Sequence, residues 1–150
     1  MKNTSPEKNI LFVCIENSNR SQMAEAFANI HGQGMVTAYS AGSRPSGKVN
    51  TKAIEAMKLI GYDLSKHQSK STDEMTDILW LASGKNSGQK AFDYVVTMGC
   101  GDECPLIPAK HREDWNIPDP KNLPMNEFIV IRNLIELKVK ELLRKIKDEN

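Results

Sequence analysis

The sequence has no apolar run long enough to cross a membrane, and its opening residues, MKNTSPEKN, lack the hydrophobic segment of a secretory signal. It also has almost no net charge, because 20 basic and 19 acidic residues leave a formal +1 at pH 7. Such a balanced chain has no overall attraction for nucleic acid or an anionic membrane, so any preference for anions must be local. We therefore expect a cytoplasmic, monomeric protein that binds neither nucleic acid nor membranes.

Cysteine occurs only as Cys14, Cys100 and Cys104. An odd number of thiols in a reducing compartment argues against a structural disulfide framework and favours reactive or metal-binding roles. A zinc site needs about four ligands, and the chain offers these thiols plus His111, without a second close pair. The thiols of Cys100 and Cys104 can meet if the residues between them form a helical turn. We favour a redox pair over a metal site or inert thiols, and we expect no bound metal.

The size and composition suit a single domain over residues 1–150, since 39% of the residues are hydrophobic and 26% are charged. Strand patterns alternate with segments whose apolar residues recur at helical spacing. This alternation predicts an α/β fold with a parallel sheet of about four strands and helices on both faces. The first expected strand ends at Cys14. The others are Met35–Ala41, a short strand within 66–71, Phe92–Met98 and Arg112–Ile117. The expected helices are Ser21–Gly32, Thr51–Ile60, Asp73–Leu79 and Glu127–Lys147.

The stretch from Ile10 to Ser21, ILFVCIENSNRS, predicts an anion-binding loop that carries a thiol nucleophile. Cys14 directly follows an apolar strand, and Arg20 stands where the next helix begins. The first N–H groups of a helix have no internal partner, and the helix dipole adds positive potential there. A tetrahedral oxyanion fits such a loop, with Arg20 as a two-pronged donor, and the same field favours the thiolate of Cys14.

The other loop residues support this interpretation to different degrees. Asn17, Ser18 and Ser21 can orient the loop or donate to the thiolate, although loop and cap hydrogen bonds alone would also explain them. Glu16 would repel an anion, so we expect its side chain to point to solvent. The competing interpretation makes Cys14 a small buried hydrophobe and Arg20 a surface side chain. We assign the whole loop to oxyanion binding: Glu16, Asn17, Ser18, Asn19, Arg20 and Ser21.

Asp119 stands between two prolines, in a rigid turn that could aim its carboxyl group at the loop. As a general acid it would protonate a leaving oxygen, which departs poorly as an oxide. An aspartate between prolines is also a common turn former, and the catalytic interpretation depends on the thiol loop.

The carboxyl ends of parallel strands meet at one edge of a sheet, where ligands of α/β folds bind. Cys14 ends the first strand, and Cys100 closely follows the strand Phe92–Met98. We therefore expect these two thiols at the same rim.

Four segments together resemble thiol-coupled arsenate reductases, which are built on the low-molecular-weight tyrosine phosphatase fold. They are CIENSNRSQMAEAF from Cys14, SAGSRP from Ser40, VVTMGCGDECP from Val95 and EDWNIPDP from Glu113. The resemblance runs in order from about residue 8 to the C-terminal helix. Position 19 is Asn where many relatives carry another cysteine, and Leu79–Lys90 is longer than in most relatives, which suggests a mobile flap or a docking loop.

The resemblance implies an arsenate reductase for arsenic detoxification. Cys14 would be the nucleophile, Arg20 the arsenate clamp with Asn17 and Ser21 as supports, and Asp119 the acid. Cys100 would attack the Cys14 adduct and release arsenite, and Cys104 would then resolve the disulfide. No tightly bound cofactor is implied: thioredoxin, or a glutathione- or mycothiol-type thiol with a glutaredoxin-like protein, would reduce the final disulfide. Sulfate or phosphate would mimic arsenate, and whether a monovalent cation supports the loop stays open.

Two alternatives remain. A low-molecular-weight tyrosine phosphatase would use Cys14, Arg20 and Asp119 but would leave Cys100 and Cys104 without a role. It usually has an aromatic residue after the Asp-Pro pair, where this chain has Lys121. A non-catalytic protein that binds an oxyanion or a metal through the three thiols is the alternative of another class.

Overall fold

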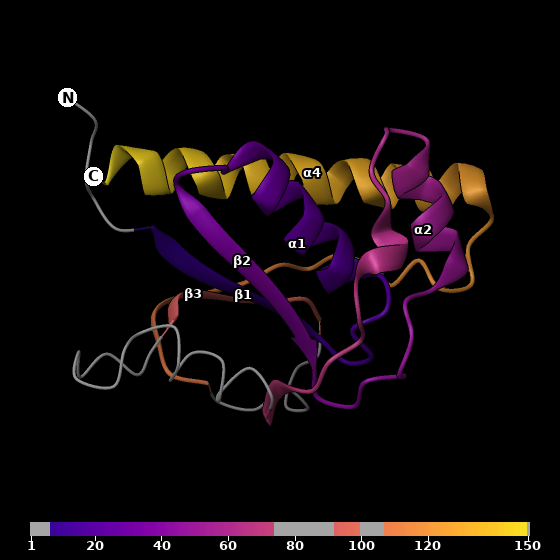
Figure 1. Ribbon diagram of the computed structural model, residues 1–150, viewed down its shortest axis with the longest axis horizontal. Helices are drawn as coiled ribbons and strands as arrows, with labels where there is room; N and C mark the ends of the chain where they lie inside the picture. The colour runs from indigo at the N-terminus through magenta and orange to yellow at the C-terminus, as the bar shows by residue number, and fades with distance from the viewer. Residues whose placement is uncertain (1–6, 74–91, 100–106, 150) are drawn as a thin grey trace.

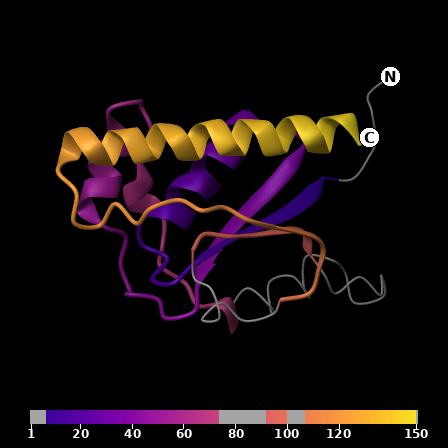
Figure 2. The same cartoon turned by 180° about the vertical axis from the view of Figure 1, so that it is seen from behind.

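The structure is a computed structural model that describes residues 7–73, 92–99 and 107–149. Its centre is a parallel four-stranded sheet in the order β2-β1-β3-β4, shown in Figure 1 and from behind in Figure 2. The strands are β1 (Lys8–Cys14), β2 (Val36–Gly42), β3 (Phe92–Thr97) and β4 (Ala109–Asp114). The expected α/β fold with a parallel sheet is confirmed.

The described α-helices gather on one face of this sheet (Figures 1 and 2). They are α1 (Arg20–His31), α2 (Thr51–Lys58) and α4 (Met125–Asp148), accompanied by the short 3-10 helix η1 (Leu64–Lys66). The long helix α4 contacts both α1 and α2. The apolar positions at helical spacing along α4 are all buried in the core beneath it, as the pattern predicts: Phe128, Ile131, Ile135, Val139, Leu142 and Ile146.

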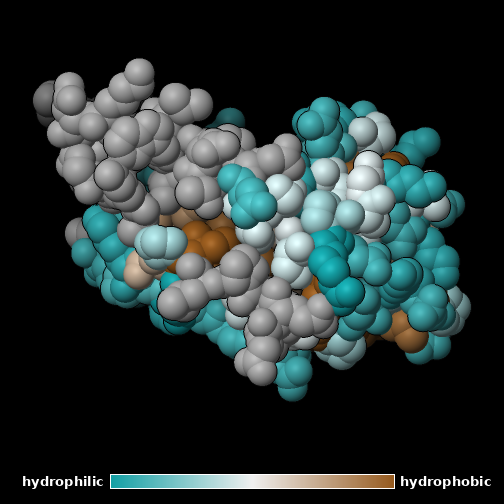
Figure 3. Space-filling view, turned by 90° about the horizontal axis from the view of Figure 1, so that it is seen from below, coloured by the Kyte–Doolittle hydropathy of each residue, from teal (hydrophilic) through white to brown (hydrophobic). Residues whose placement is uncertain are grey.

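Strand β1 is buried on both sides, and this decides where its last side chain points. Ile10, Phe12 and Cys14 belong to the core that the helices cover, whereas Leu11 and Val13 belong to a second apolar cluster on the opposite face. Figure 3 views the molecule from that opposite side, where hydrophobic residues are visible between hydrophilic ones. The expected helix Asp73–Leu79 lies almost entirely outside the described residues. Helices on both faces of the sheet therefore stay a prediction.

Three segments differ from expectation. Helix α2 ends at Lys58 rather than at residue 60, and Ile60 beyond it is 46% exposed instead of buried. Segment 66–71 forms no strand apart from a single bridge between Ser71 and Gly42, because its backbone bonds to the loop region through Gly42 and Asn17 instead.

Strand β4 begins and ends three residues earlier than expected, at Ala109–Asp114 instead of 112–117. The apolar residues that suggested the later position, Trp115 and Ile117, are buried in the core beyond the strand. β4 itself is a polar edge strand, which a search for apolar alternation misses.

Within the described residues, no helix combines the length and the apolar character that a membrane span requires.

Candidate active site

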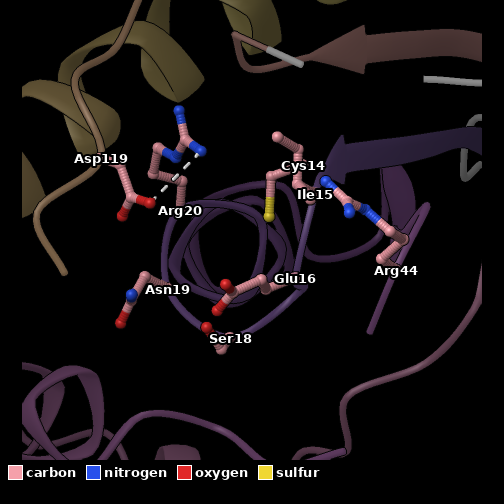
Figure 4. A pocket seen from close by; sticks show the side chains of 8 residues that line it. All are labelled: Cys14, Ile15, Glu16, Ser18, Asn19, Arg20, Arg44 and Asp119. Carbon is pink, nitrogen blue, oxygen red and sulfur yellow. Dashed lines mark ion pairs between the residues drawn. The ribbon is translucent and has the colours of Figure 1, made fainter. Parts of the chain in front are cut away.

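The loop between β1 and α1 forms the floor of a pocket, which Figure 4 shows with α1 seen end-on. β1 ends at Cys14, as the sequence predicts, and α1 begins at Arg20, one residue earlier than expected. The loop passes so close to Gly42 on β2 that a Cβ there would lie 2.5 Å from the carbonyl oxygen of Ile15. Only glycine fits this position, and its absent side chain lets the loop fold back over the end of the sheet.

The pocket is lined by the loop and by two segments distant in sequence. Arg44 comes from the chain after β2, and Asp119 from the turn before α4. The lining comprises Cys14, Ile15, Glu16, Ser18, Asn19, Arg20, Arg44 and Asp119. The structure thus brings Cys14, Arg20 and Asp119 together around one cavity, although more than a hundred positions of sequence separate the first from the last.

Arg20 is buried rather than on the surface, with only 7% of the residue exposed. Its Nη1 donates to the carbonyl oxygen of Ile117 at 3.0 Å, and its Nη2 lies 3.8 Å from Oδ2 of Asp119. One donor therefore anchors the guanidinium to the segment that carries Asp119. The surface interpretation of this arginine is wrong.

Cys14 lies at the end of a directional hydrogen-bond chain. The backbone N–H of Lys70 donates to Oδ1 of Asn17 at 2.7 Å, which fixes the orientation of that amide. Nδ2 of Asn17 must therefore donate to Oγ of Ser21, at 2.7 Å. Oγ of Ser21 lies 2.9 Å from Sγ of Cys14, and its hydroxyl is the only possible donor of this pair when Cys14 is a thiolate. The hydroxyl is thus placed to donate to the sulfur when Cys14 acts as a nucleophile.

The chain of bonds extends to residues that the sequence analysis did not assign to the site. Nε2 of Gln22 donates to the backbone oxygens of Asn17 and Gln68, so Oε1 of Gln22 must accept from Nδ1 of His67, at 3.0 Å. The hydroxyl of Tyr62 then donates to Nε2 of His67, at 2.6 Å. His67 is therefore a fully bonded part of the loop's support, and its side chain is only 7% exposed.

Burial and the neighbouring charges of Lys70 and Lys66 lower the pKa of His67 to about 4. The imidazole is therefore neutral at physiological pH, which agrees with one ring nitrogen donating and the other accepting.

We predict an acid destabilisation that depends on His67. Between its ordinary pKa near 6.5 and the folded value of about 4, the unfolded chain binds more protons than the folded one. The free energy of unfolding should fall as the pH drops through this window, and His67→Gln should flatten that part of the curve. Urea unfolding at a series of pH values measures both proteins. Equal slopes would contradict a neutral buried imidazole.

We also predict that Ser21→Ala slows alkylation of Cys14 by iodoacetamide at pH 7 about tenfold or more, because a hydrogen bond to a charged group contributes about 1.5–3 kcal/mol. The measurement uses a chain in which Cys100 and Cys104 are serine. Ser43→Ala is the matched control, since the buried hydroxyl of Ser43 has no hydrogen-bond partner among the described residues. Equal rates for the two variants would show that Ser21 does not act on the thiol.

The carboxyl group of Asp119 is 47% exposed at the pocket edge, and its Oδ1 accepts from the backbone N–H of Lys121 at 3.1 Å. Trp115 nearby packs against Phe12 in the core, with ring centroids 5.7 Å apart. The segment that leads into the Asp119 turn is therefore held in place by a buried side chain.

The remaining loop residues differ in their placement. Ser18 and Asn19 are buried, and Oδ1 of Asn19 has no hydrogen-bond partner within the described part of the chain. Glu16 does reach solvent, as expected, but it also lines the pocket and pairs with Lys121. Arg44 is a second arginine at the pocket that sequence reasoning missed, although it lies within the quoted SAGSRP motif.

Cys100 and Cys104 lie outside the described residues, so the expected meeting of the thiols is untested. The end of β3 lies at the same rim, because Thr97 pairs with Val13 and the N–H of Met98 donates to the carbonyl oxygen of Val13. Across residues 7–73, 92–99 and 107–149, no group of three or more His, Cys, Asp or Glu residues is placed to hold a metal ion.

Comparisons with known proteins agree with this geometry. An arsenate reductase of Staphylococcus aureus (strain N315) is 40% identical over 140 residues, covering 90% of this chain and 95% of that protein. A thioredoxin-dependent arsenate reductase of Corynebacterium glutamicum superposes with a TM-score of 0.75 at 30% identity, covering 99% of this chain but 66% of that one. An arsenate reductase solved in a phosphate-binding state gives a TM-score of 0.75 at 31% identity, covering 93% of this chain and 98% of that one. The family model of the low molecular weight phosphotyrosine protein phosphatases matches residues 9–150, and the chain belongs to this family.

Proposed function

We propose that this protein reduces arsenate to arsenite through a thiol relay of Cys14, Cys100 and Cys104. The observation that carries the proposal is the hydroxyl of Ser21, 2.9 Å from Sγ of Cys14, in a pocket that Arg20 and Asp119 also line. A thiol held beside an anion site is the arrangement that attack on an oxyanion requires. The arsenate reductases at 30–40% identity support arsenate as that oxyanion.

The first step is attack of the Cys14 thiolate on arsenic. The N–H groups at the start of α1 and the guanidinium of Arg20 hold the oxyanion in this step. An arsenic–sulfur bond forms and an arsenic–oxygen bond breaks. Asp119 gives a proton to the departing oxygen, which leaves as water rather than as an oxide.

The second step moves two electrons to arsenic. The Cys100 thiolate attacks Sγ of Cys14, the sulfur–arsenic bond breaks towards arsenic, and As(V) becomes As(III). Arsenite leaves, and a Cys14–Cys100 disulfide remains. Cys104 then attacks Cys100, which frees Cys14 and leaves a Cys100–Cys104 disulfide.

Support for the reach of Cys100 comes from the residue before it. A Cβ at Gly99 would lie only 3.1 Å from Nη1 of Arg20, and Gly99 has a φ of +75°, which favours glycine. The chain thus continues into Cys100 from a position against the arginine of the anion loop.

The electron donor is an external thiol system, and thioredoxin is the candidate that the Corynebacterium glutamicum relative favours. A glutathione- or mycothiol-type thiol with a glutaredoxin-like protein is the alternative, and either fits a cytoplasmic protein. We include no monovalent cation in the mechanism.

A Cys104→Ser variant tests the relay. We expect it to release about one equivalent of arsenite per protein in a single turnover and then stop, because the Cys14–Cys100 disulfide cannot be passed on. Arsenite is measured after mixing reduced protein with arsenate, alongside thioredoxin-dependent consumption of NADPH. A Cys100→Ser variant should release none. Full steady-state turnover by the Cys104 variant would refute the relay.

The same experiment separates the alternatives. A phosphatase would hydrolyse phosphate esters, and its rate of hydrolysis would not change when Cys100 or Cys104 is replaced by serine. A non-catalytic binding protein would retain an oxyanion or a metal without consuming reductant.

A further inference from the structure

Glu16 is an unusual residue for an anion-binding loop, and its partner is specific. Its carboxylate is 40% exposed and lies at the pocket wall, as Figure 4 shows. Nζ of Lys121 donates to both of its oxygens, at 3.0 Å and 3.4 Å. A negative charge beside the bound oxyanion is thereby compensated by a lysine from another segment.

Lys121 also ties the loop to the turn that carries the acid. Its backbone N–H donates to Oδ1 of Asp119, while its side chain reaches Glu16. The ion pair therefore forms a strap between the loop and the Asp119 turn at the pocket edge. Exposed ion pairs add little stability, so the pair contributes little to the fold itself.

The position of the strap affects inorganic and organic oxyanions differently. An inorganic oxyanion has only oxygen atoms around its centre and fits within the loop. In a phosphate monoester, the oxygen that leaves is the one that Asp119 protonates, so the organic group must lie on the side of Asp119, whose turn also carries Lys121. An apolar group there would strip water from two charges without replacing it, which is unfavourable.

The hollow next to the strap has no aromatic side chain in its wall. It shares Glu16 and Ser18 with the anion pocket and is otherwise lined by Lys121, Ser46, Lys48, Asn50, Thr51 and Asn122. None of these side chains is aromatic, so an aryl group finds no ring to stack on there.

We propose that the Glu16–Lys121 pair is a specificity determinant that admits compact inorganic oxyanions and rejects aryl phosphate esters at the pocket edge. The proposal rests on the proposed function, because it concerns the oxyanion pocket that Cys14 serves. It explains how a pocket with a thiol, an arginine and an acid can favour reduction of a small anion over ester hydrolysis.

The test compares wild type with the double variant Glu16→Gln/Lys121→Met. Two quantities are measured: kcat/KM for hydrolysis of p-nitrophenyl phosphate, and the inhibition constant of inorganic phosphate. In the hydrolysis, the phosphoryl group passes to Cys14, Asp119 protonates the leaving phenolate, and water then releases phosphate. We expect kcat/KM for the ester, relative to the phosphate affinity, to rise at least tenfold.

The single variants give a second readout. Lys121→Met leaves Glu16 uncompensated beside the pocket, so phosphate binding should weaken, whereas Glu16→Gln should strengthen it. Glu136→Gln/Lys140→Met is the matched control, because it removes another exposed pair, 3.8 Å apart on α4. The proposal would be overturned if kcat/KM for the ester, relative to the phosphate affinity, were unchanged in the double variant or rose equally in the control. If wild type binds no phosphate, the proposed function itself fails; if it binds phosphate and makes arsenite while the ratio is unchanged, only the strap fails.

Discussion

Cys14→Ser is expected to lower arsenate reduction to the background, a loss of at least about 10⁴-fold, as when other enzymes lose their nucleophile. Serine keeps the size of the side chain and can still accept from Ser21. Its hydroxyl is a far weaker nucleophile near neutral pH, and it cannot form the disulfide with Cys100. Arsenite production is measured with saturating reductant over hours, so that slow residual turnover is detected.

The same variant separates a nucleophile from a buried structural cysteine. The thiol is 3% exposed and belongs to the hydrophobic core, so a purely structural role would appear as lost stability. We expect the variant to keep phosphate affinity within about threefold of wild type and to unfold cooperatively. Turnover above about one hundredth of the wild-type rate would rule out Cys14 as the attacking group.

Arg20→Lys is expected to reduce kcat/KM for arsenate by about 10²–10³-fold and to weaken phosphate binding in parallel. Lysine keeps the charge but loses the planar fork. It therefore cannot hold the carbonyl oxygen of Ile117, 3.0 Å away, and two oxygens of a tetrahedral anion at once. Isothermal titration with phosphate and steady-state kinetics with arsenate measure the two effects.

Arg132→Lys provides the matched control. Arg132 is also buried, with 8% exposed, and its Nη1 donates to the carbonyl oxygen of Ala56 at 2.7 Å, away from the pocket. This variant should lose stability while phosphate affinity stays at the wild-type value. If Arg20→Lys behaved in the same way, Arg20 would be a structural arginine and not an anion clamp.

The anion loop could be predicted because it is local. Strand, loop and helix follow one another from Lys8 to His31, so the apolar run, the thiol and the position of Arg20 are read from one short stretch. The central strands were equally accessible, since burial on both faces makes them continuously apolar. The parallel topology then places the ends of β1 and β3 at one rim.

The support of the loop could not be predicted, because it joins segments distant in sequence. Gln22 resembles any polar helix residue, and His67 stands in a polar stretch without periodicity. Their meeting depends on how the chain after η1 packs beside Asn17. The bounds of β4 could not be predicted for another reason. An exposed edge strand has no apolar alternation, and the hydrophobic Trp115 that suggested a strand belongs to the core beyond it.

The direction of the bonds that run from Lys70 through Asn17 to Ser21 is set by a peptide group. The N–H of Lys70 cannot exchange donor and acceptor roles, whereas hydroxyls and amides can. The donor–acceptor direction of these hydrogen bonds is therefore set by the main chain and does not depend on which amino acid occupies position 70. Proline is the single exception, because it has no N–H. Evolution can thus vary the side chain there, and with it the charge beside the loop, without turning the amide of Asn17 that donates to Ser21.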